Sequence, residues 1–529
     1  MKKSSYIFVP LAAATFVVLH ACGRDDATSG PVPAATSAAA PNLSAVQNIV
    51  VIYAENRSFD DVYGNFPGAN GLQNASATSM TQIDRDGTTL PMLPPVWGGL
   101  TAPGFGPVIT EAMTAGLANK PFALDDPNGF DVSSDLTTRD MYHRFYENQM
   151  QIDGGKNDGF VAWGDSGALV MQHYVSNPVN VPLYNIAKKY VLTDNFFMGT
   201  FGSSFMNHQW LICACVASYP NAAQSPAKSQ LSVVNPDGVT LTVASDSPES
   251  ALDGIPKFVN SGLLTPDGFA VNTIEPPYQP SGNPPPPGGD QTLADLSDSD
   301  TLVPQTQTTI GDLLSAANVS WAWYGGAWQA ALNDRSIIFS APIQFQPHHQ
   351  PFNFYKQFAP GTAARTEHLL DGGLGGSEFL KAIDAGTLPA VSFYKPQGNL
   401  NEHAGYSNVQ DAETHIVNVI HHLERSPQWN NMVVIVTYDE NGGIWDHVAP
   451  PKGDRWGPGS RIPTLVISPF AKMGTVDHTL YDTTSILRLI TERFDLPVLP
   501  GITSREAALQ AAGGAQSGDL IGGALNLTR

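Results

Sequence analysis

Four polar side chains follow a short stretch of sequence that is typical of a buried β-strand. Residues 49–53 are apolar, β-branched or aromatic without interruption, which favours a strand covered on both faces. Glu55, Asn56, Arg57 and Asp60 come directly after it. A turn needs no such concentration of carboxylate, amide and guanidinium groups. We expect Arg57 to pair with Asp60 and brace the loop, and we treat Glu55 and Asn56 as candidates for chemistry.

A second strand-like stretch, residues 432–438, is followed in the same way by Asp439 and Glu440. Ligands of open α/β sheets bind outside the carboxyl ends of the strands, so two neighbouring strands would bring these residues to Glu55 and Asn56. Three carboxylates share a desolvated site only with a compensating cation. Oxygen ligands suit a hard divalent ion such as Ca²⁺, Mg²⁺ or Mn²⁺, with Zn²⁺ and iron as alternatives. Turn chemistry explains either motif alone; both together favour one divalent metal ion.

A third feature is the Gly-Ser-Ser turn at residues 202–204, between apolar residues 196–198 and a run with helical character. A serine at such a turn can be an exposed nucleophile, with backbone N–H groups of the helix start available to hold an anion. Most Gly-Ser turns have no chemistry, so the turn alone is a weak signal. Asn207 and His208, which follow closely, strengthen it slightly.

An α/β sheet is the element that would position these groups, and the rest of the chain has the pattern for one. Continuous apolar runs of strand length alternate with runs of helical periodicity, which is typical of strands covered by helices. Helical runs with a following strand occupy residues 181–197, 309–325 and 378–394, and a helical run at 412–428 precedes strands within 432–440 and 464–470.

Several longer motifs resemble the bacterial acid phosphatase / phospholipase C superfamily of phosphoesterases. The motifs are ENRSFD at 55–60, SSFMNHQ at 203–209, HHQPFNFY at 348–355, and DENGGIWDHVAPP at 439–451 with PTLVISPF at 463–470. The resemblance extends over about residues 48–494. It implies an alkaline-phosphatase-like α/β fold: a central, mostly parallel sheet flanked by helices, with a smaller irregular cap portion.

The resemblance also implies roles for individual residues. Glu55, Asn56, Asp439 and Glu440 match the metal ligands of the family, and Ser204 matches its nucleophile. The acid phosphatase branch is the closer one, because the phospholipase C branch typically has Thr where this chain has Ser204.

Histidines of the chain match family histidines that line the pocket. His143, His349 and His403 are the matching residues, and His348 is an equally possible candidate for the place of His349. Protonated histidines would hold phosphate oxygens and protonate the leaving group. Activity that depends on them would fall as pH rises past their pKa, which suits an acid optimum.

The resemblance predicts an exported, metal-dependent acid phosphatase that hydrolyses small phosphomonoesters with broad specificity through a phosphoserine on Ser204. The alternative is a phospholipase C that cleaves phosphatidylcholine-like phosphodiesters. Ser204, together with the lack of a visible acidic-aromatic box for choline, favours the monoesterase. A third possibility, from another class, is a surface lipoprotein that binds a partner without catalysis; the complete ligand set and Ser204 argue against it.

Domain organisation follows from composition. Residues 1–22 have the layout of a signal peptide with a lipobox-like end at Cys22. Residues 23–46, rich in Ala, Pro and Ser, predict a flexible linker, and residues 47–529 a single phosphoesterase catalytic domain. Within it, residues 273–300 are Pro/Gly-rich and predict a surface excursion. We expect export to the periplasm or outer membrane, or secretion, with membrane contact only through a lipid on Cys22.

The charge balance limits the partners of the protein. The 529-residue chain has a net charge of −21. An acidic surface disfavours nucleic acid, whose binding depends on cations that meet phosphates. It equally disfavours electrostatic docking on anionic lipid.

Two pairs of residues are expected to have structural roles. Cys213 and Cys215 are two residues apart, which is poor spacing for a disulfide, so we expect small buried hydrophobic side chains. Asp446 and His447 are expected to support the metal-binding strand from behind the ligands.

Overall fold

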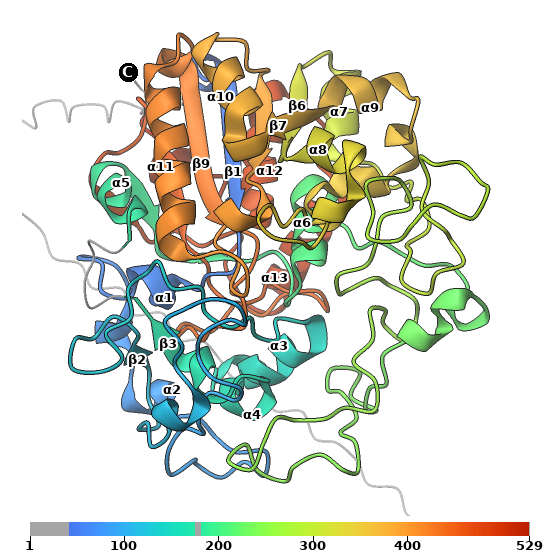
Figure 1. Ribbon diagram of the computed structural model, residues 1–529. Helices are drawn as coiled ribbons and strands as arrows, with labels where there is room; N and C mark the ends of the chain where they lie inside the picture. The colour runs from blue at the N-terminus through green and yellow to red at the C-terminus, as the bar shows by residue number, and fades with distance from the viewer. Residues whose placement is uncertain (1–41, 175–180, 528–529) are drawn as a thin grey trace, which may run out of the picture. The chain divides into compact units, whose positions relative to one another are not determined.

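A computed structural model describes residues 42–174 and 181–527 of the protein (Figure 1). The predicted signal peptide and most of the predicted linker lie outside these residues. Residues 42–46 already belong to the folded part: the backbone N–H of Asn42 donates to Leu527, and Val46 is fully buried. The flexible linker therefore does not extend to residue 46 as predicted.

The core of the described chain is an eight-stranded sheet with the order β11-β4-β10-β9-β1-β8-β6-β7. Its strands are β1 Asn48–Ala54, β4 Val191–Thr193, β6 Trp321–Gly326, β7 Leu369–Gly373, β8 Val391–Lys395, β9 Met432–Tyr438, β10 Thr464–Ile467 and β11 Thr475–Asp477. Only β10 is antiparallel to its neighbours, β9 and β4. The predicted central, mostly parallel sheet is confirmed.

Two-stranded pairings, fourteen α-helices and a number of short 3-10 helices complete the described regular structure. The pairings are β2 Phe122–Ala123 with β3 Gln172–His173, and β5 Phe196–Phe197 with β12 Tyr481–Asp482. The α-helices are α1 Phe59–Tyr63, α2 Ala77–Met80, α3 Phe145–Ile152, α4 Phe160–Trp163, α5 Leu183–Lys189, α6 Ser204–Cys213, α7 Ile310–Ala316, α8 Trp328–Asn333, α9 Ala363–His368, α10 Ser377–Asp384, α11 Val409–Arg425, α12 Thr483–Phe494, α13 Pro500–Ala511 and α14 Ile521–Ala524. No described helix is both long and apolar enough for a membrane span.

Helices cover both faces of the sheet, as the continuous apolar strands require. Figure 1 shows α10 and α11 in front of the sheet and α12 behind it. All seven residues of β1 and all seven of β9 are buried. The two strands pair in parallel over their whole length, so both end at the same edge of the sheet.

A loop-rich portion lies beyond this edge and contains little regular structure (Figure 1). The predicted surface excursion at 273–300 belongs to it, and the prediction is only half right. Residues 274–281 are buried, whereas most of residues 284–300 are at least partly exposed. Glu275 is among the buried residues, and burial raises the pKa of its carboxyl to about 7.

The prediction for the two cysteines is wrong. Cys213 and Cys215 form a disulfide with a Cα–Cα distance of 5.1 Å. Cys213 is the last residue of α6, and the helix ends because Ala214 adopts a left-handed conformation. This reversal of the backbone brings the two sulfurs together, which the spacing in the sequence does not reveal.

Candidate active site

The four residues predicted to bind a metal converge at the carboxyl ends of β1 and β9. Glu55, Asn56, Asp439 and Glu440 are all buried. The backbone N–H of Asn56 donates to Asp439 Oδ1 over 3.1 Å, which ties the two loops together. The parallel pairing of the two strands explains this convergence, because each loop leaves the sheet at the same edge.

Ser204 lies among these carboxylates at the first residue of α6. Its hydroxyl donates to Glu55 Oε2 over 3.1 Å and lies 3.4 Å from Glu440 Oε1. The turn before the helix is tight: Ser203 has a φ of 60°, and Gly202 one of 49°. Helix starts leave backbone N–H groups unpaired, so a phosphate held against Ser204 would meet donors there.

The oxygen donors fit a divalent cation. The Asn56 amide lies between these groups: its nitrogen donates to Glu55 Oε2 over 3.0 Å and to Asp439 Oδ1 over 3.2 Å, and its oxygen accepts from His403 Nε2 over 3.1 Å. Asp439 Oδ2 has no hydrogen-bond partner among the described residues. Burial, together with the charge of Glu55, raises the pKa of Asp439 well above its usual value, and burial beside Asp439 does the same for the pKa of Glu440. A bound cation would pair with Asp439 Oδ2 and would favour the ionised forms of Asp439 and Glu440.

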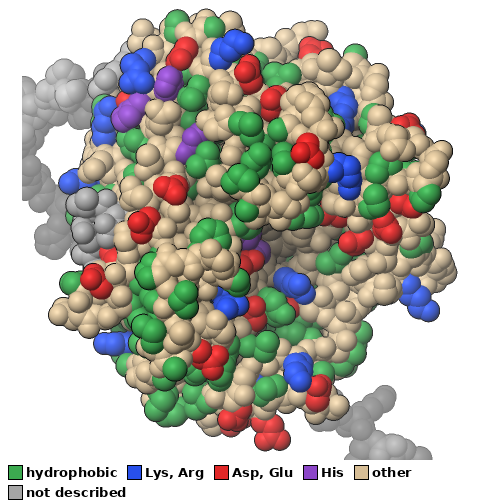
Figure 2. All heavy atoms as spheres, in the orientation of Figure 1, with side chains coloured by type: hydrophobic (Ala, Val, Ile, Leu, Met, Phe, Trp, Pro, Cys, Tyr) green, Lys and Arg blue, Asp and Glu red, His purple; other side chains and the backbone are tan. Residues whose placement is uncertain are grey.

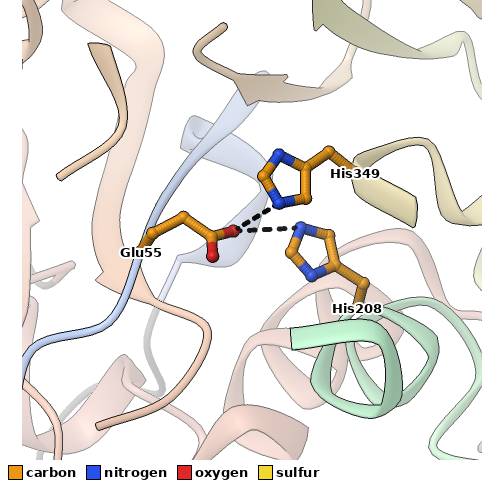
Figure 3. A group of neighbouring side chains, drawn as sticks. All are labelled: Glu55, His208 and His349. Carbon is orange, nitrogen blue, oxygen red and sulfur yellow. Dashed lines mark ion pairs between the residues drawn. The ribbon is translucent and has the colours of Figure 1, made fainter. Parts of the chain in front are cut away.

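Nitrogen atoms surround the other side of Glu55 (Figure 3). Its Oε1 lies 3.1 Å from His349 Nε2 and 3.8 Å from His208 Nε2, and it forms an ion pair with the Lys395 ammonium. Burial raises the pKa of Glu55, but the attraction of His349 and Lys395 outweighs it and holds that pKa well below its usual value. Glu55 is therefore ionised at neutral pH.

A second donor set shares Glu55 with the first. Glu55, His208 and His349 offer atoms within 4.8 Å of one another. The Nε2 atoms of both histidines are buried without a hydrogen-bond partner among the described residues, and their rings stack with centroids 5.0 Å apart. This mixed nitrogen and oxygen set suits Zn²⁺, whereas the oxygen set suits Ca²⁺, Mg²⁺ or Mn²⁺.

His143 and His403 approach the site from the opposite side. His143 Nε2 lies 3.5 Å from Glu440 Oε1, His403 Nε2 lies 3.1 Å from the Asn56 amide, and the two rings are 5.4 Å apart. His143 and Ser203 line a cavity of about 290 Å³. Figure 2 shows a hollow near the middle of this face, with histidine and acidic side chains in it.

His349, and not His348, contacts the carboxylate. The His348 ring stacks edge-on against His349 and has no ion pair with an acidic residue among the described residues. Burial lowers the pKa of His349 to about 4, the pKa of His348 far below its usual value, and the pKa of His143 to a smaller extent. Without a bound anion these three rings are therefore neutral at pH 7, in contrast to the protonated state that the resemblance implies for the reaction.

The predicted pairing of Arg57 with Asp60 is wrong. Arg57 contacts Asp61 over 3.2 Å and Glu402 over 3.8 Å. Asp60 instead pairs with Arg461 over 3.0 Å. Arg57 lies before α1, and the turn into the helix at Ser58 brings its guanidinium to Asp61 and not to Asp60.

Asp446 and His447 join Asp60 and Arg461 in a buried cluster. The Arg461 guanidinium contacts Asp446 over 3.1 Å, and His447 Nδ1 lies 2.6 Å from Asp60 Oδ2. Asp446 also accepts from the backbone N–H of Asp60 over 3.1 Å. The cluster connects the loops after β1 and β9, which agrees with the supporting role predicted for Asp446 and His447.

Sequence reasoning missed Lys395 and gave His208 no role. Lys395 is the last residue of β8, the strand beside β1, so the rule applied to the other two strands would have found it. His208 follows Ser204 by four residues on α6, and this spacing places both side chains on one face of the helix.

Comparisons with known proteins agree with the motifs. The model of the phosphoesterase family matches residues 46–497. Phospholipase C B of Mycobacterium tuberculosis is 24% identical over 94% of this chain and 82% of its own length. A non-hemolytic phospholipase C of Burkholderia pseudomallei is 30% identical over 35% of this chain and 29% of its own length. A solved protein of the alkaline phosphatase superfamily from Vibrio parahaemolyticus is 11% identical, with a TM-score of 0.28 over 62% of this chain and 63% of that one.

Proposed function

This chain belongs to the phosphoesterase family and is a phosphoric ester hydrolase, and we propose that it hydrolyses phosphomonoesters with Ser204 as the nucleophile and one divalent metal ion as the cofactor. The observation that carries this proposal is the position of the Ser204 hydroxyl. It lies at a helix start within hydrogen-bond distance of Glu55 and Glu440, two members of a buried set of three carboxylates.

The first step is an in-line attack on phosphorus. Ser204 Oγ forms the new P–O bond while its proton passes to the Glu440 carboxylate 3.4 Å away, and the bond from phosphorus to the leaving oxygen breaks. When bound, a divalent cation supplies positive charge that favours the serine alkoxide and the phosphate oxygens. The backbone N–H groups at the start of α6 hold the non-bridging oxygens.

Histidines complete the reaction. His143 lies at the cavity beside Glu440, and His403 lies next to it, so either ring in its protonated form can give its Nε2 proton to the leaving alkoxide. A water molecule then attacks the phosphoserine and its proton returns to the histidine. The P–O bond to Ser204 breaks as Ser204 Oγ takes back the proton held by Glu440. Phosphate and the free Ser204 hydroxyl are the products.

Two features bear on the choice between monoester and diester. The cavity beside the nucleophile is about 290 Å³, enough for a small leaving group. The relatives argue against a monoester, because they are named phospholipases C. Cleavage of phosphatidylcholine-like diesters is therefore the second candidate. Export and a lipid on Cys22 remain predictions from the first residues of the chain, and a non-catalytic binding role is the least supported reading.

Ser204→Ala tests the nucleophile. We expect kcat on p-nitrophenyl phosphate to fall roughly a thousandfold or more, because no other group can form the covalent intermediate. Ser426→Ala is the matched control, since Ser426 is also a buried serine but donates to a backbone carbonyl away from the site. Activity near the wild-type value in Ser204→Ala would remove the assignment. Acid quenching of the wild type with a ³²P-labelled monoester should trap label on Ser204.

A further inference from the structure

The cavity beside Ser204 has the lining of a site for a quaternary ammonium group. It is bounded by two carboxylates, Asp140 and Asp165, and by the ring of Tyr142, with Ser203 and His143 at the end near the nucleophile. Aromatic faces beside carboxylates are the common recognition device for choline-type cations. No motif in the sequence shows this box, because Asp165 comes from a different segment.

A hydrogen bond holds this acidic-aromatic group together. The backbone N–H of Tyr142 donates to Asp165 Oδ1 over 2.8 Å, which fixes the Asp165 carboxylate beside the segment that carries the Tyr142 ring. Asp140 lies 3.6 Å from His143 Nδ1 and is half exposed at the mouth. The cavity therefore carries negative charge close to the place where a leaving group would lie.

Arg144 already occupies the aromatic face of this box. Its guanidinium carbon lies 5.0 Å from the centre of the Tyr142 ring, and Nη1 donates to the Ser261 carbonyl over 3.3 Å. Among the described residues that line the cavity, Arg144 is the only Lys or Arg. The Arg144 guanidinium therefore occupies the position on the Tyr142 ring where the cation of a choline group would stack.

We propose that Arg144 is a specificity-determining residue that excludes choline-type leaving groups and restricts the site to uncharged ones. The inference rests on the proposed function, because it assigns the cavity to the leaving group. A quaternary ammonium would have to displace the guanidinium from the ring and would meet its charge at short range. Uncharged alcohols do not meet this repulsion.

Arg144→Gln tests the proposal. The substrates are phosphocholine and 3,3-dimethylbutyl phosphate, two phosphomonoesters whose leaving alcohols have the same shape and differ only in the cation, with released phosphate as the readout. The ratio of their kcat/KM values should shift about tenfold towards the choline ester in Arg144→Gln, because the ring and both carboxylates become available. Arg144→Lys keeps a cation in the cavity and should stay near the wild-type ratio.

Arg455→Gln is the matched control. Its guanidinium carbon lies 4.2 Å from the ring centre of Trp456, so it too is an Arg stacked on an aromatic ring, but it does not line the cavity. The substrate ratio should not change in this variant. An equal shift in Arg455→Gln, or no shift in Arg144→Gln with wild-type folding by circular dichroism, would overturn the proposal.

Two further measurements complement the substrate ratio. Wild-type protein should prefer 3,3-dimethylbutyl phosphate to phosphocholine; the opposite preference would overturn the proposal. Tetramethylammonium, followed by calorimetry, should bind the wild type at least about tenfold more weakly than Arg144→Gln. If the wild type hydrolyses no phosphoester, the proposed function fails, whereas the tetramethylammonium comparison still decides the role of Arg144.

Discussion

At the scale of single residues, Glu55 is the point where the groups of the site meet. Its carboxylate contacts Ser204, His349 and Lys395 and is fully buried. With all three buried carboxylates ionised, the proposed divalent ion and the Lys395 ammonium would balance their charges.

Lys395→Met tests this balance. In the presence of chelator the variant should lose about 3–5 kcal/mol of free energy of unfolding, because Glu55 is left buried without its cation. A divalent ion should restore more stability to the variant than to the wild type. Lys189→Met breaks an exposed ion pair with Glu424 and should cost under about 1 kcal/mol. Equal urea midpoints for Lys395→Met and wild type in chelator would contradict the balance.

The histidines predict a pH dependence of activity. Burial lowers the pKa of His143, so its protonated fraction falls as pH rises through a value below the usual 6.5. If His143 protonates the leaving group, kcat/KM falls over the same range, which gives an acid optimum. The pH profile of kcat/KM should be measured from pH 4 to 8 in the wild type and in two variants. The fall of kcat/KM with rising pH should vanish in His143→Gln. It should remain in the control His422→Gln, which removes an ion pair near the surface. If kcat/KM of His143→Gln falls with rising pH as in the wild type, another group protonates the leaving group.

At the scale of elements, the turn into α6 sets the position of the nucleophile. Gly202 has a φ of 49°, and a Cβ there would lie 2.5 Å from the carbonyl oxygen of Arg144. Glycine is required because the backbone of the Arg144 segment passes against it. The same contact joins the nucleophile turn to the wall of the leaving-group cavity.

Gly202→Ala should therefore displace Ser204. We expect kcat to fall about a hundredfold, since a shift of about 1 Å in a reacting group has this effect. Gly104→Ala is the control: Gly104 also has a positive φ, 88°, but has open space around it. Both variants carry the backbone strain, so only the close contact separates them. Equal kcat values in steady-state assays of the two variants would contradict this explanation.

At the scale of the whole described chain, the site joins segments that are distant in sequence. The loops after β1 and β9 come together with α6 and with His349. The proposed cation would hold them in one cluster and would contribute to the stability of the fold as well as to the reaction. The sheet alone fixes where the loops start but leaves their carboxylates mutually repelling.

Removal of the metal should lower the melting temperature. At an ion concentration of 100 times Kd, the bound ion adds about 2.7 kcal/mol, which corresponds to about 3 °C in a chain of this size. After chelation, Ca²⁺, Mg²⁺, Mn²⁺, Zn²⁺ and Fe²⁺ are added back one at a time. The ion that restores both the melting temperature and the activity is the cofactor. Asp439→Asn should no longer respond to the ion. A melting temperature that chelator leaves unchanged would contradict the metal assignment.

The sequence by itself determined the parts of this protein that depend on local pattern. Continuous apolar runs predicted the parallel sheet, and the polar residues directly after residues 49–53 and 432–438 predicted the cluster of Glu55, Asn56, Asp439 and Glu440. Both predictions hold because the position of a residue at the end of a strand fixes its place at the edge of the sheet. The resemblance in four motifs supplied the family.

Only the tertiary structure decided which side chains touch. It paired Lys395 with Glu55, moved Arg57 from Asp60 to Asp61, joined Cys213 to Cys215, and separated His349 from His348. It also assembled an acidic-aromatic cavity and placed Arg144 over its ring. Such contacts depend on the angles at which loops leave the elements and on the rotamers that burial selects, and neither is encoded in the spacing of residues along the chain.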